Sequence, residues 1–290
     1  MFICRGYVII ALEFLRDMAV RYAPCPYERT PGTCKRERAG RMQEKDIPKQ
    51  DGIVSGTIRV DQTMTDDQGN MTILSIASGM QDLAGDQLID LGIGFDFTST
   101  RGLLWVVVWS EFVFTRLPRL GETITFYTWP GKKMHWFYPR RAYVFDESGA
   151  ELVHGSYLWM LMDATSRKVT EDHGLLGVLP AVSVEGECKI PPMKMIFPQE
   201  LANSLIRTVE STEIDGNRHL NNAHYLNWTS DLAVTCGFSM DKLENLWINY
   251  KKEILPGDTV TLRYERTGAI LYVSGIGKEE HFIAKLVFSA

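Results

Sequence analysis

The sequence contains an internal repeat, which restricts the folds open to this chain more than any other feature. Residues 60–66 resemble residues 209–215, which lie 149 positions further on (209 − 60). Residues 121–126 resemble residues 257–262, which lie 136 positions further on (257 − 121), and a Leu-Pro pair stands just before each. Two matches in the same order predict a duplicated module, with 13 more residues (149 − 136) between the matches in the first copy.

The same order of elements is predicted in both copies. The repeated residues 60–66 and 209–215 are predicted as strands, and each is followed by apolar residues at three- and four-residue spacings, which predict helices over 72–91 and 222–236. Later runs rich in Val, Ile, Thr and aromatic residues predict further antiparallel strands at 103–115, 123–129, 141–145, 157–162, 246–254, 259–264, 270–276 and 282–288. One long helix for about five strands predicts an α+β fold in which a sheet wraps around a helix, twice over.

Charge divides the chain into an extension and a body. Residues 1–50 hold 10 Lys or Arg and 6 Asp or Glu, so this part carries +4 and the remaining 240 residues carry −9 of the total of −5. We therefore expect a poorly ordered extension at 1–50, a first module at 51–185, a linker at 186–199 and a second module at 200–290. Three prolines in the linker prevent it from continuing a strand.

The overall composition excludes several classes of protein. Hydrophobic residues make up 45% and charged residues 23% of the chain, as in ordinary globular proteins, and no uncharged apolar run is long enough to predict a membrane span. The negative net charge argues against nucleic-acid binding. Five scattered cysteines without a Cys-x-x-Cys pair indicate neither a disulfide framework nor a zinc site, which favours a reducing cytoplasm without excluding a plastid.

The richest polar cluster lies directly before the second predicted helix. Asp215, Asn217 and His219 alternate with other residues there, and Asn221 or Asn222 is the expected N-cap. Free backbone N–H groups at a helix start can hold a developing oxyanion, so the cluster is a candidate catalytic site. The alternative is that these residues only close a turn and cap a helix. Residues 66–70 of the first copy make a similar turn without the Asn and the His, which favours the functional interpretation.

These residues make the sequence similar to the acyl-acyl-carrier-protein thioesterases, the plant plastid enzymes and their bacterial relatives that release fatty acids. The family pattern is met by Asp215, Asn217, His219, Asn221, Asn222, Tyr225 and Trp228. Residues 103–129 and 157–170 of the first copy also resemble the sequences of this family. The resemblance covers about 53–289 and implies two fused hotdog modules, each with an antiparallel sheet wrapped on a central helix.

The resemblance also implies a role for Glu253. The family has an aromatic residue, two basic residues, a Glu and often a Cys, which Tyr250, Lys251, Lys252 and Glu253 match, whereas Ile254 occupies the Cys position. Hydrolysis must then use an activated water, with Glu253 as general base and its pKa raised toward neutrality by burial. The alternative is a carboxylate paired only with Lys251 or Lys252.

The implied reaction is hydrolysis of fatty acyl thioesters on acyl carrier protein, without a metal or organic cofactor. Asn217 would position the water or the carbonyl, while His219 and Asp215 would hold Asn217. The expected acyl pocket lies in the first module and is lined by Met80, Leu83, Ala84 and Leu88. Asn222, Lys251 and Lys252 would also bind substrate. We expect a monomer with an internal pseudo-dimer, or a homodimer.

Carrier-protein docking requires a local basic surface, because acyl carrier protein is acidic and the body of this chain is too. The candidates are Lys132, Lys133, Arg140, Arg141, Lys251 and Lys252, or these are merely solvated strand ends and turns. Three other functions remain open: an acyl-coenzyme A thioesterase, a hotdog-type hydroxyacyl dehydratase or hydratase, and a non-enzymatic acyl-binding protein. The complete set of Asp215, Asn217, His219 and Glu253 argues against the last of these.

Overall fold

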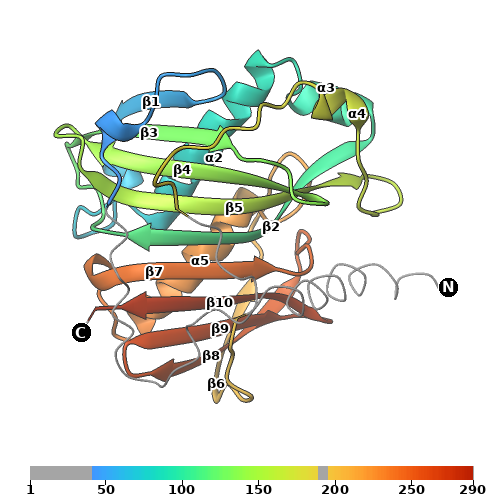
Figure 1. The fold of residues 1–290 in the computed structure, drawn as a ribbon. Helices are drawn as coiled ribbons and strands as arrows, with labels where there is room; N and C mark the ends of the chain where they lie inside the picture. The colour runs from blue at the N-terminus through green and yellow to red at the C-terminus, as the bar shows by residue number, and fades with distance from the viewer. Residues whose placement is uncertain (1–40, 189–194, 290) are drawn as a thin grey trace.

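The two copies of the repeat form the two halves of one antiparallel sheet. The computed structural model describes residues 41–188 and 195–289 and arranges ten strands in the order β1-β3-β4-β5-β2-β7-β10-β9-β8-β6 (Figure 1). The first copy supplies β1 (Val54–Arg59), β2 (Leu103–Phe114), β3 (Thr123–Pro130), β4 (Phe137–Asp146) and β5 (Glu151–Asp163). The second copy supplies β6 (Asn203–Thr208), β7 (Leu243–Tyr250), β8 (Thr259–Thr267), β9 (Ile270–Ile276) and β10 (Glu280–Phe288). From the centre outward, the two halves repeat the same strand order.

One long helix packs on each half of the sheet. Helices α2 (Ile73–Asp90) and α5 (Asn222–Thr235) lie on the same face of the sheet and contact each other (Figure 1). The two halves join through β2 and β7, from Trp109 opposite Asn249 to Val113 opposite Asn245. The predicted α+β architecture of two hotdog modules, each a sheet wrapped on a helix, is confirmed.

The extra residues of the first copy lie between its two matched segments. There α2 has 18 residues against 14 in α5, and β2 has 12 against 8 in β7. The first copy also inserts the short helix α3 (Phe95–Thr100) between α2 and β2. The remaining short elements are α4 (His173–Leu176), η1 (Glu44–Asp46), η2 (Gln62–Met64), η3 (Ser211–Glu213) and η4 (Met240–Lys242).

The repeated residues 60–66 and 209–215 are not strands, as the sequence predicts, but contain the 3-10 turns η2 and η3. The strands β1 and β6 end just before them. In the first copy the Asp61 side chain accepts a hydrogen bond from the N–H of Thr63 at 2.8 Å, which curls the backbone after the strand. Glu210 and Glu213 form a capping box around η3 in the same way. Local side-chain bonds therefore override the strand propensity of these residues.

The chain before β1 and the linker cover part of the first half of the sheet. Met42 and Ile47 are buried, and they form one cluster with Val182 and Val184, which lie just before the linker, and with Trp129, Tyr143 and Phe145 from the sheet. The expected extension is therefore too long, because residues 42–47 are part of the packed fold. Residues 1–40 and 189–194 lie outside the described residues, as do Cys4, Cys25 and Cys34. No helix in the described ranges is long and apolar enough to cross a membrane.

Candidate active site

The polar cluster predicted from the sequence forms a closed loop between η3 and α5. One carboxylate oxygen of Asp215 accepts hydrogen bonds from the N–H groups of Asn217, at 2.8 Å, and of His219, at 3.3 Å. The Asn221 side chain accepts from the N–H of Ala223 at 2.9 Å, so Asn221 is the N-cap of α5 and Asn222 is its first residue. This loop holds the backbone of Asn217 and His219 directly before the helix.

Glu253 lies beside this loop because the chain leaves the sheet after β7. The N–H of Leu220 donates to the backbone oxygen of Ile254 at 2.8 Å, and Nδ1 of His281 donates to the backbone oxygen of Glu253 at 3.0 Å. The first bond ties the segment after β7 to the loop before α5, and the second ties Glu253 to β10. They bring Oε2 of Glu253 to 3.0 Å from Nε2 of His219. The structure thus brings His219 and Glu253 together, 34 positions apart in sequence (253 − 219).

A residue of the first module, Arg167, completes this cluster. Its Nη1 lies 3.1 Å from Oε2 of Glu253, and its Nη2 lies 3.3 Å from Nε2 of His219. Arg167 follows β5 and has the left-handed backbone angle φ of 56°, as Arg218 in the loop before α5 has 64°. No sequence pattern singles out Arg167. It lies within the family-like residues 157–170, but nothing in one sequence ranks it above the adjacent Ser166 or Lys168.

The charges around Glu253 lower the pKa of its carboxyl group below the usual value. The hydrogen bond from His219 is the largest cause, and the nearby charges of His219, Arg167 and Lys252 act in the same direction, while partial burial opposes them. The expected rise of this pKa toward neutrality is therefore wrong. Its side chain is 39% exposed, so burial is too weak to outweigh the positive neighbours.

Asn217 is held differently from what the sequence suggests. Its backbone is bound by Asp215, but within the described residues its side-chain amide makes no hydrogen bond, and His219 pairs with Glu253 instead. The N–H groups of Ala223 and His224 both donate to Asn221, whereas that of Asn222 has no acceptor among the described residues. The amide of Asn217 and the N–H of Asn222 are thus available to a ligand.

The residues that the structure describes contain no group of three or more His, Cys, Asp and Glu side chains that could hold a metal ion. Cys188 and Cys236 are free thiols. Cys236 caps the C-terminal end of α5 and packs against the core, at the opposite end of the helix from the catalytic loop. The position where the family often has a cysteine is filled by Ile254, which is fully buried. Among the described residues, neither free thiol contacts His219.

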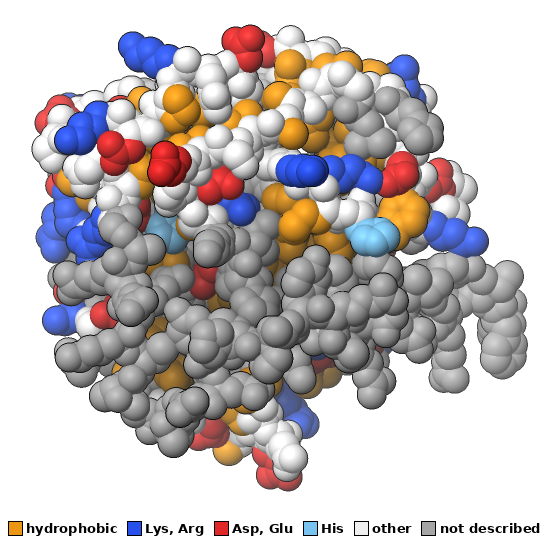
Figure 2. Space-filling model, viewed as in Figure 1, with side chains coloured by type: hydrophobic (Ala, Val, Ile, Leu, Met, Phe, Trp, Pro, Cys, Tyr) orange, Lys and Arg blue, Asp and Glu red, His pale blue; other side chains and the backbone are white. Residues whose placement is uncertain are grey.

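The basic candidates for carrier docking differ in their surroundings. Lys251 forms an ion pair with Glu280, and Nζ of Lys252 lies 3.2 Å from Glu279, so neither lysine is the partner of Glu253. Lys133 pairs with Glu171 and Lys132 is exposed. On the face drawn in Figure 2, basic and acidic side chains of the first module lie interspersed.

Arg140 and Arg141 cannot belong to a docking surface, because each is only 7% exposed. Nη1 of Arg140 donates to Oε1 of Gln87 at 2.9 Å, and burial lowers the pKa of Arg140 to about 10. Nε of Arg141 donates to the backbone oxygen of Cys188 at 2.7 Å, on the linker. Both expectations for these arginines, a docking surface or solvated strand ends, are therefore wrong, because the sequence does not reveal that α2 and the linker cover the two faces of β4.

The expected acyl-pocket residues lie along α2. Met80 and Ala84 are on its buried face, whereas Leu83 and Leu88 are half-buried. The hydroxyl of Tyr157, on β5, contacts the sulfur of Met80 at 3.4 Å. One turn beyond Ala84, the buried Gln87 meets Arg140, so the apolar face of α2 ends in a polar layer.

The fold and the site define a double-hotdog protein with a His–Glu pair and an unengaged Asn at the start of the second central helix. Residues 55–172 match the model of the acyl-ACP thioesterase N-terminal domain, and residues 199–285 match that of the C-terminal domain. The chain therefore belongs to the acyl-ACP thioesterase family.

Individual relatives are distant. An acyl-[acyl-carrier-protein] hydrolase of Cuphea viscosissima is 24% identical over 53% of this chain and 39% of its own length. A dodecanoyl-[acyl-carrier-protein] hydrolase of Cinnamomum camphora is 25% identical over 63% of this chain and 51% of its own length. The chain thus spans about half or less of these curated relatives.

Solved structures support the fold over a larger part of the chain. An acyl-ACP thioesterase of Bacteroides thetaiotaomicron superposes with a TM-score of 0.70 at 19% identity, covering 86% of this chain and all of that one. A 12:0-ACP thioesterase of Umbellularia californica superposes with a TM-score of 0.71 at 18% identity, covering 84% of this chain and 99% of that one. At these identities the likeness concerns the fold.

Proposed function

We propose that this protein hydrolyses fatty acyl thioesters of acyl carrier protein and releases the free fatty acid. The observation that carries the proposal is the pair of His219 and Glu253 next to the unengaged amide of Asn217, in a chain of this family. A turn and a helix cap would require only Asp215 and Asn221. His219 and Glu253 form an additional polar pair, and Asn217 lies two positions before His219 in the same loop, which suits hydrolysis.

The attacking water is activated by His219 and Glu253 acting together. Glu253 is ionised at neutral pH and accepts a hydrogen bond from Nε2–H of His219, so the form of this imidazole that acts as a base has its lone pair on Nδ1. His219 takes a proton from water as the water oxygen bonds to the thioester carbon. The carbon–sulfur bond then breaks, and the proton passes to the departing thiolate. Because its lowered pKa makes Glu253 a weak base, we assign proton transfer to His219.

The carbonyl oxygen gains negative charge during this step and needs hydrogen-bond donors. Two are available at the helix start, the side-chain amide of Asn217 and the N–H of Asn222. Both lie near the positive end of the α5 dipole, which stabilises a developing anion. Asp215 contributes by holding the backbone of Asn217 and His219.

The acyl chain lies along the apolar face of α2, next to Met80, Leu83, Ala84 and Leu88. These residues belong to the module without the catalytic residues, which leaves its helix free to serve binding. The carrier protein docks around the catalytic loop, where the exposed Arg218 and the partly exposed Lys251 and Lys252 supply positive charge. The ion pairs of the two lysines reduce their share of this attraction.

The decisive experiment compares three substrates with the purified protein. Thiol release is measured from an acyl-acyl carrier protein and from the matching acyl-coenzyme A, and water loss is measured from a hydroxyacyl thioester. We expect thiol release with a higher kcat/KM for the carrier-protein substrate. Equal or better hydrolysis of the coenzyme A thioester would identify the other thioesterase class, and water loss without thiol release would identify a dehydratase.

A further inference from the structure

We propose that Arg167 is a positioning residue through which the first module holds the catalytic pair of the second module in place. This inference rests on the proposed function and adds to it a residue outside the family motif of the catalytic loop. It implies that the active site is built by both modules, although the sequence motif lies entirely in the second.

The guanidinium group of Arg167 contacts both members of the pair. Nη1 is 3.1 Å from Oε2 of Glu253, the same oxygen that His219 binds, and Nη2 is 3.3 Å from Nε2 of His219. Nη1 holds the oxygen that accepts Nε2–H of His219, whereas Nη2 packs against that nitrogen without a hydrogen bond, because both are donors. A planar guanidinium keeps these two nitrogens in fixed relative positions. A lysine, with one flexible ammonium group, cannot match this geometry.

The loop that carries Arg167 is tied to the end of β5. The N–H of Arg167 donates to the backbone oxygen of Asp163 at 2.9 Å, and the N–H of Asp163 donates to that of Lys168 at 2.8 Å. The side chain of Asp163 accepts from both the N–H and the hydroxyl of Ser166. This closed turn places Arg167 in the left-handed conformation, which is energetically unfavourable for a non-glycine residue. The position of the side chain is therefore set by the first module.

Stability does not account for this contact. The side chains of Arg167 and Glu253 are 42% and 39% exposed, and ion pairs at such positions contribute little to folding. A contact that costs backbone strain and adds little stability, made to two residues of the catalytic pair, is better explained by alignment of that pair.

The charge environment of Glu253 gives this role a measurable consequence. The groups that face it are His219 and Lys252, Arg167 from the first module, Tyr225 on α5, and His281, which binds its backbone oxygen. Arg167 is the one charged contributor among these that comes from the first module. Its removal takes away a positive charge that lowers the Glu253 pKa, so this pKa must rise. An Arg167 side chain that is turned away from Glu253 in solution would not shift it.

The test compares Arg167→Gln and Arg167→Lys with the wild-type protein. In the Gln variant we expect kcat to fall, on the order of 10-fold to 10²-fold, because the pair is misaligned. The acid limb of its pH–rate profile should move to higher pH, because the positive charge beside both members of the pair is gone. The Lys variant should keep the acid limb near its wild-type position while recovering only part of kcat. Arg101→Ala is the matched control, since Arg101 also forms an exposed ion pair in the first module, with Asp172 at 3.9 Å.

A second measurement needs no substrate. The carboxyl group of Glu253 is titrated by carbon-13 NMR in the wild-type protein and in Arg167→Gln, with thermal unfolding to verify the fold. A raised Glu253 pKa in the folded variant supports the inference even if the natural substrate is not an acyl thioester. An unchanged carboxyl titration, or a pH–rate profile and kcat like those of Arg101→Ala, would overturn it.

Discussion

The loops before α2 and α5 have the same backbone bonding but different chemistry. In the first module, Oδ1 of Asp66 accepts from the N–H groups of Gln68 and Asn70 at 3.0 and 2.8 Å. In the second, Asp215 binds Asn217 and His219 in the same pattern. The offset of 149 residues relates all three pairs of positions. The duplication thus preserved the turn and changed the side chains that the turn presents.

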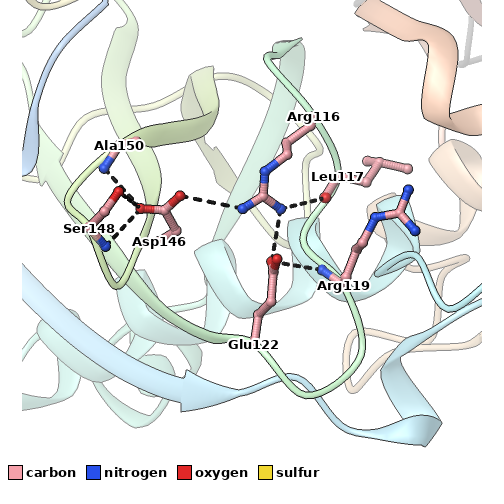
Figure 3. A network of polar contacts seen from close by, with 7 residues as sticks. All are labelled: Arg116, Leu117, Arg119, Glu122, Asp146, Ser148 and Ala150. Carbon is pink, nitrogen blue, oxygen red and sulfur yellow. Dashed lines mark hydrogen bonds and ion pairs between the residues drawn. The ribbon is translucent and has the colours of Figure 1, made fainter.

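The segment opposite each loop diverges in the same way. The N–H of Met71 donates to the backbone oxygen of Pro118 at 2.7 Å, as that of Leu220 does to Ile254 at 2.8 Å. The counterpart of Glu253 is Leu117 (253 − 136), which is buried in the core. Figure 3 shows the residues around it, where Arg116 bridges Glu122 at 2.8 Å and Asp146 at 3.4 Å. These ion pairs join the turn after β2 to the end of β4, so at this position the first module has structural contacts only.

The two loops also differ in the residue that adopts the left-handed backbone conformation. Gly69 has a φ of 75°, which glycine adopts freely, and its counterpart Arg218 has a φ of 64°. The second module therefore accepts strain to present an exposed arginine between Asn217 and His219. The shared backbone bonding of the turn belongs to the fold, whereas the changed side chains of the second loop and the strained backbone of Arg218 are the features to which we assign the proposed function.

The largest expected effect comes from removing the catalytic pair. His219→Ala and Glu253→Gln should each lower kcat by roughly 10² to 10⁴, because general acid–base help of this size is lost. The fold should remain, since Asp215 still closes the loop. Thiol release and circular dichroism measure the two properties. Asn217→Ala is expected to lose activity on a similar scale, and Gln68→Ala, its exposed counterpart, is the control with near wild-type activity. Wild-type turnover of His219→Ala would remove it from the mechanism.

The second effect concerns the length of the acyl chain and distinguishes the roles of α2 and α5. Ala84 on α2 and Ala233 on α5 are related by the 149-residue offset, and both are buried. Ala84→Phe should shift preference toward shorter acyl chains, by about 10-fold in relative kcat/KM, because a packed pocket cannot absorb the added volume. Competition between acyl chains of several lengths measures this. Ala233→Phe should reduce stability without changing the preference, and a lower rate at unchanged preference in Ala84→Phe would show that the pocket lies elsewhere.

The third effect tests how each helix is anchored. On α5, Nε1 of Trp228 donates to the buried Glu213 at 2.7 Å, whereas its counterpart on α2 is Gly79, against the ring of Phe126. Trp228→Phe should lower the free energy of unfolding by about 1–3 kcal/mol, since it leaves a buried acceptor without its closest donor. Gly79→Ala places a Cβ 2.9 Å from the Phe126 ring, but improved helix propensity offsets part of that cost. Urea unfolding of the two variants measures both changes. An equal or larger loss of unfolding free energy in Gly79→Ala would contradict this prediction.

The smallest effect concerns Arg218 and the carrier protein. Arg218→Glu should raise KM several-fold for acyl-acyl carrier protein, and added salt should shrink the defect by screening the charges. A coenzyme A substrate should be affected much less. Lys252→Glu is expected to have a weaker effect, because Glu279 already offsets its charge. Arg218→Gly, which relieves the strained backbone, should weaken docking without loss of stability, and an equal defect on both substrates would exclude a role in docking.

Much of the fold could be predicted because it depends on short-range patterns. Helices at 72–91 and 222–236 match α2 and α5 to within one residue at each end, since their apolar spacing follows the helical period. Strand β9 matches the prediction at both ends. The predicted strand at 246–254 runs past the end of β7 at Tyr250. The chain turns away there, and the backbone oxygen of Ile254 accepts a hydrogen bond from Leu220 across the site. That bond depends on a partner more than 30 positions away, which no local pattern contains.

The sequence by itself determined the duplication, the two central helices and the catalytic loop, because repeats, periodicity and turn-forming side chains act over a few neighbouring residues. Tertiary structure alone decided that Glu253 faces His219, that Arg167 reaches them from the other module and that Arg140 is buried. It also decided the direction of the Glu253 pKa shift. These outcomes depend on which distant segments pack together and on the charges and burial that result, and none of those quantities is local in the chain.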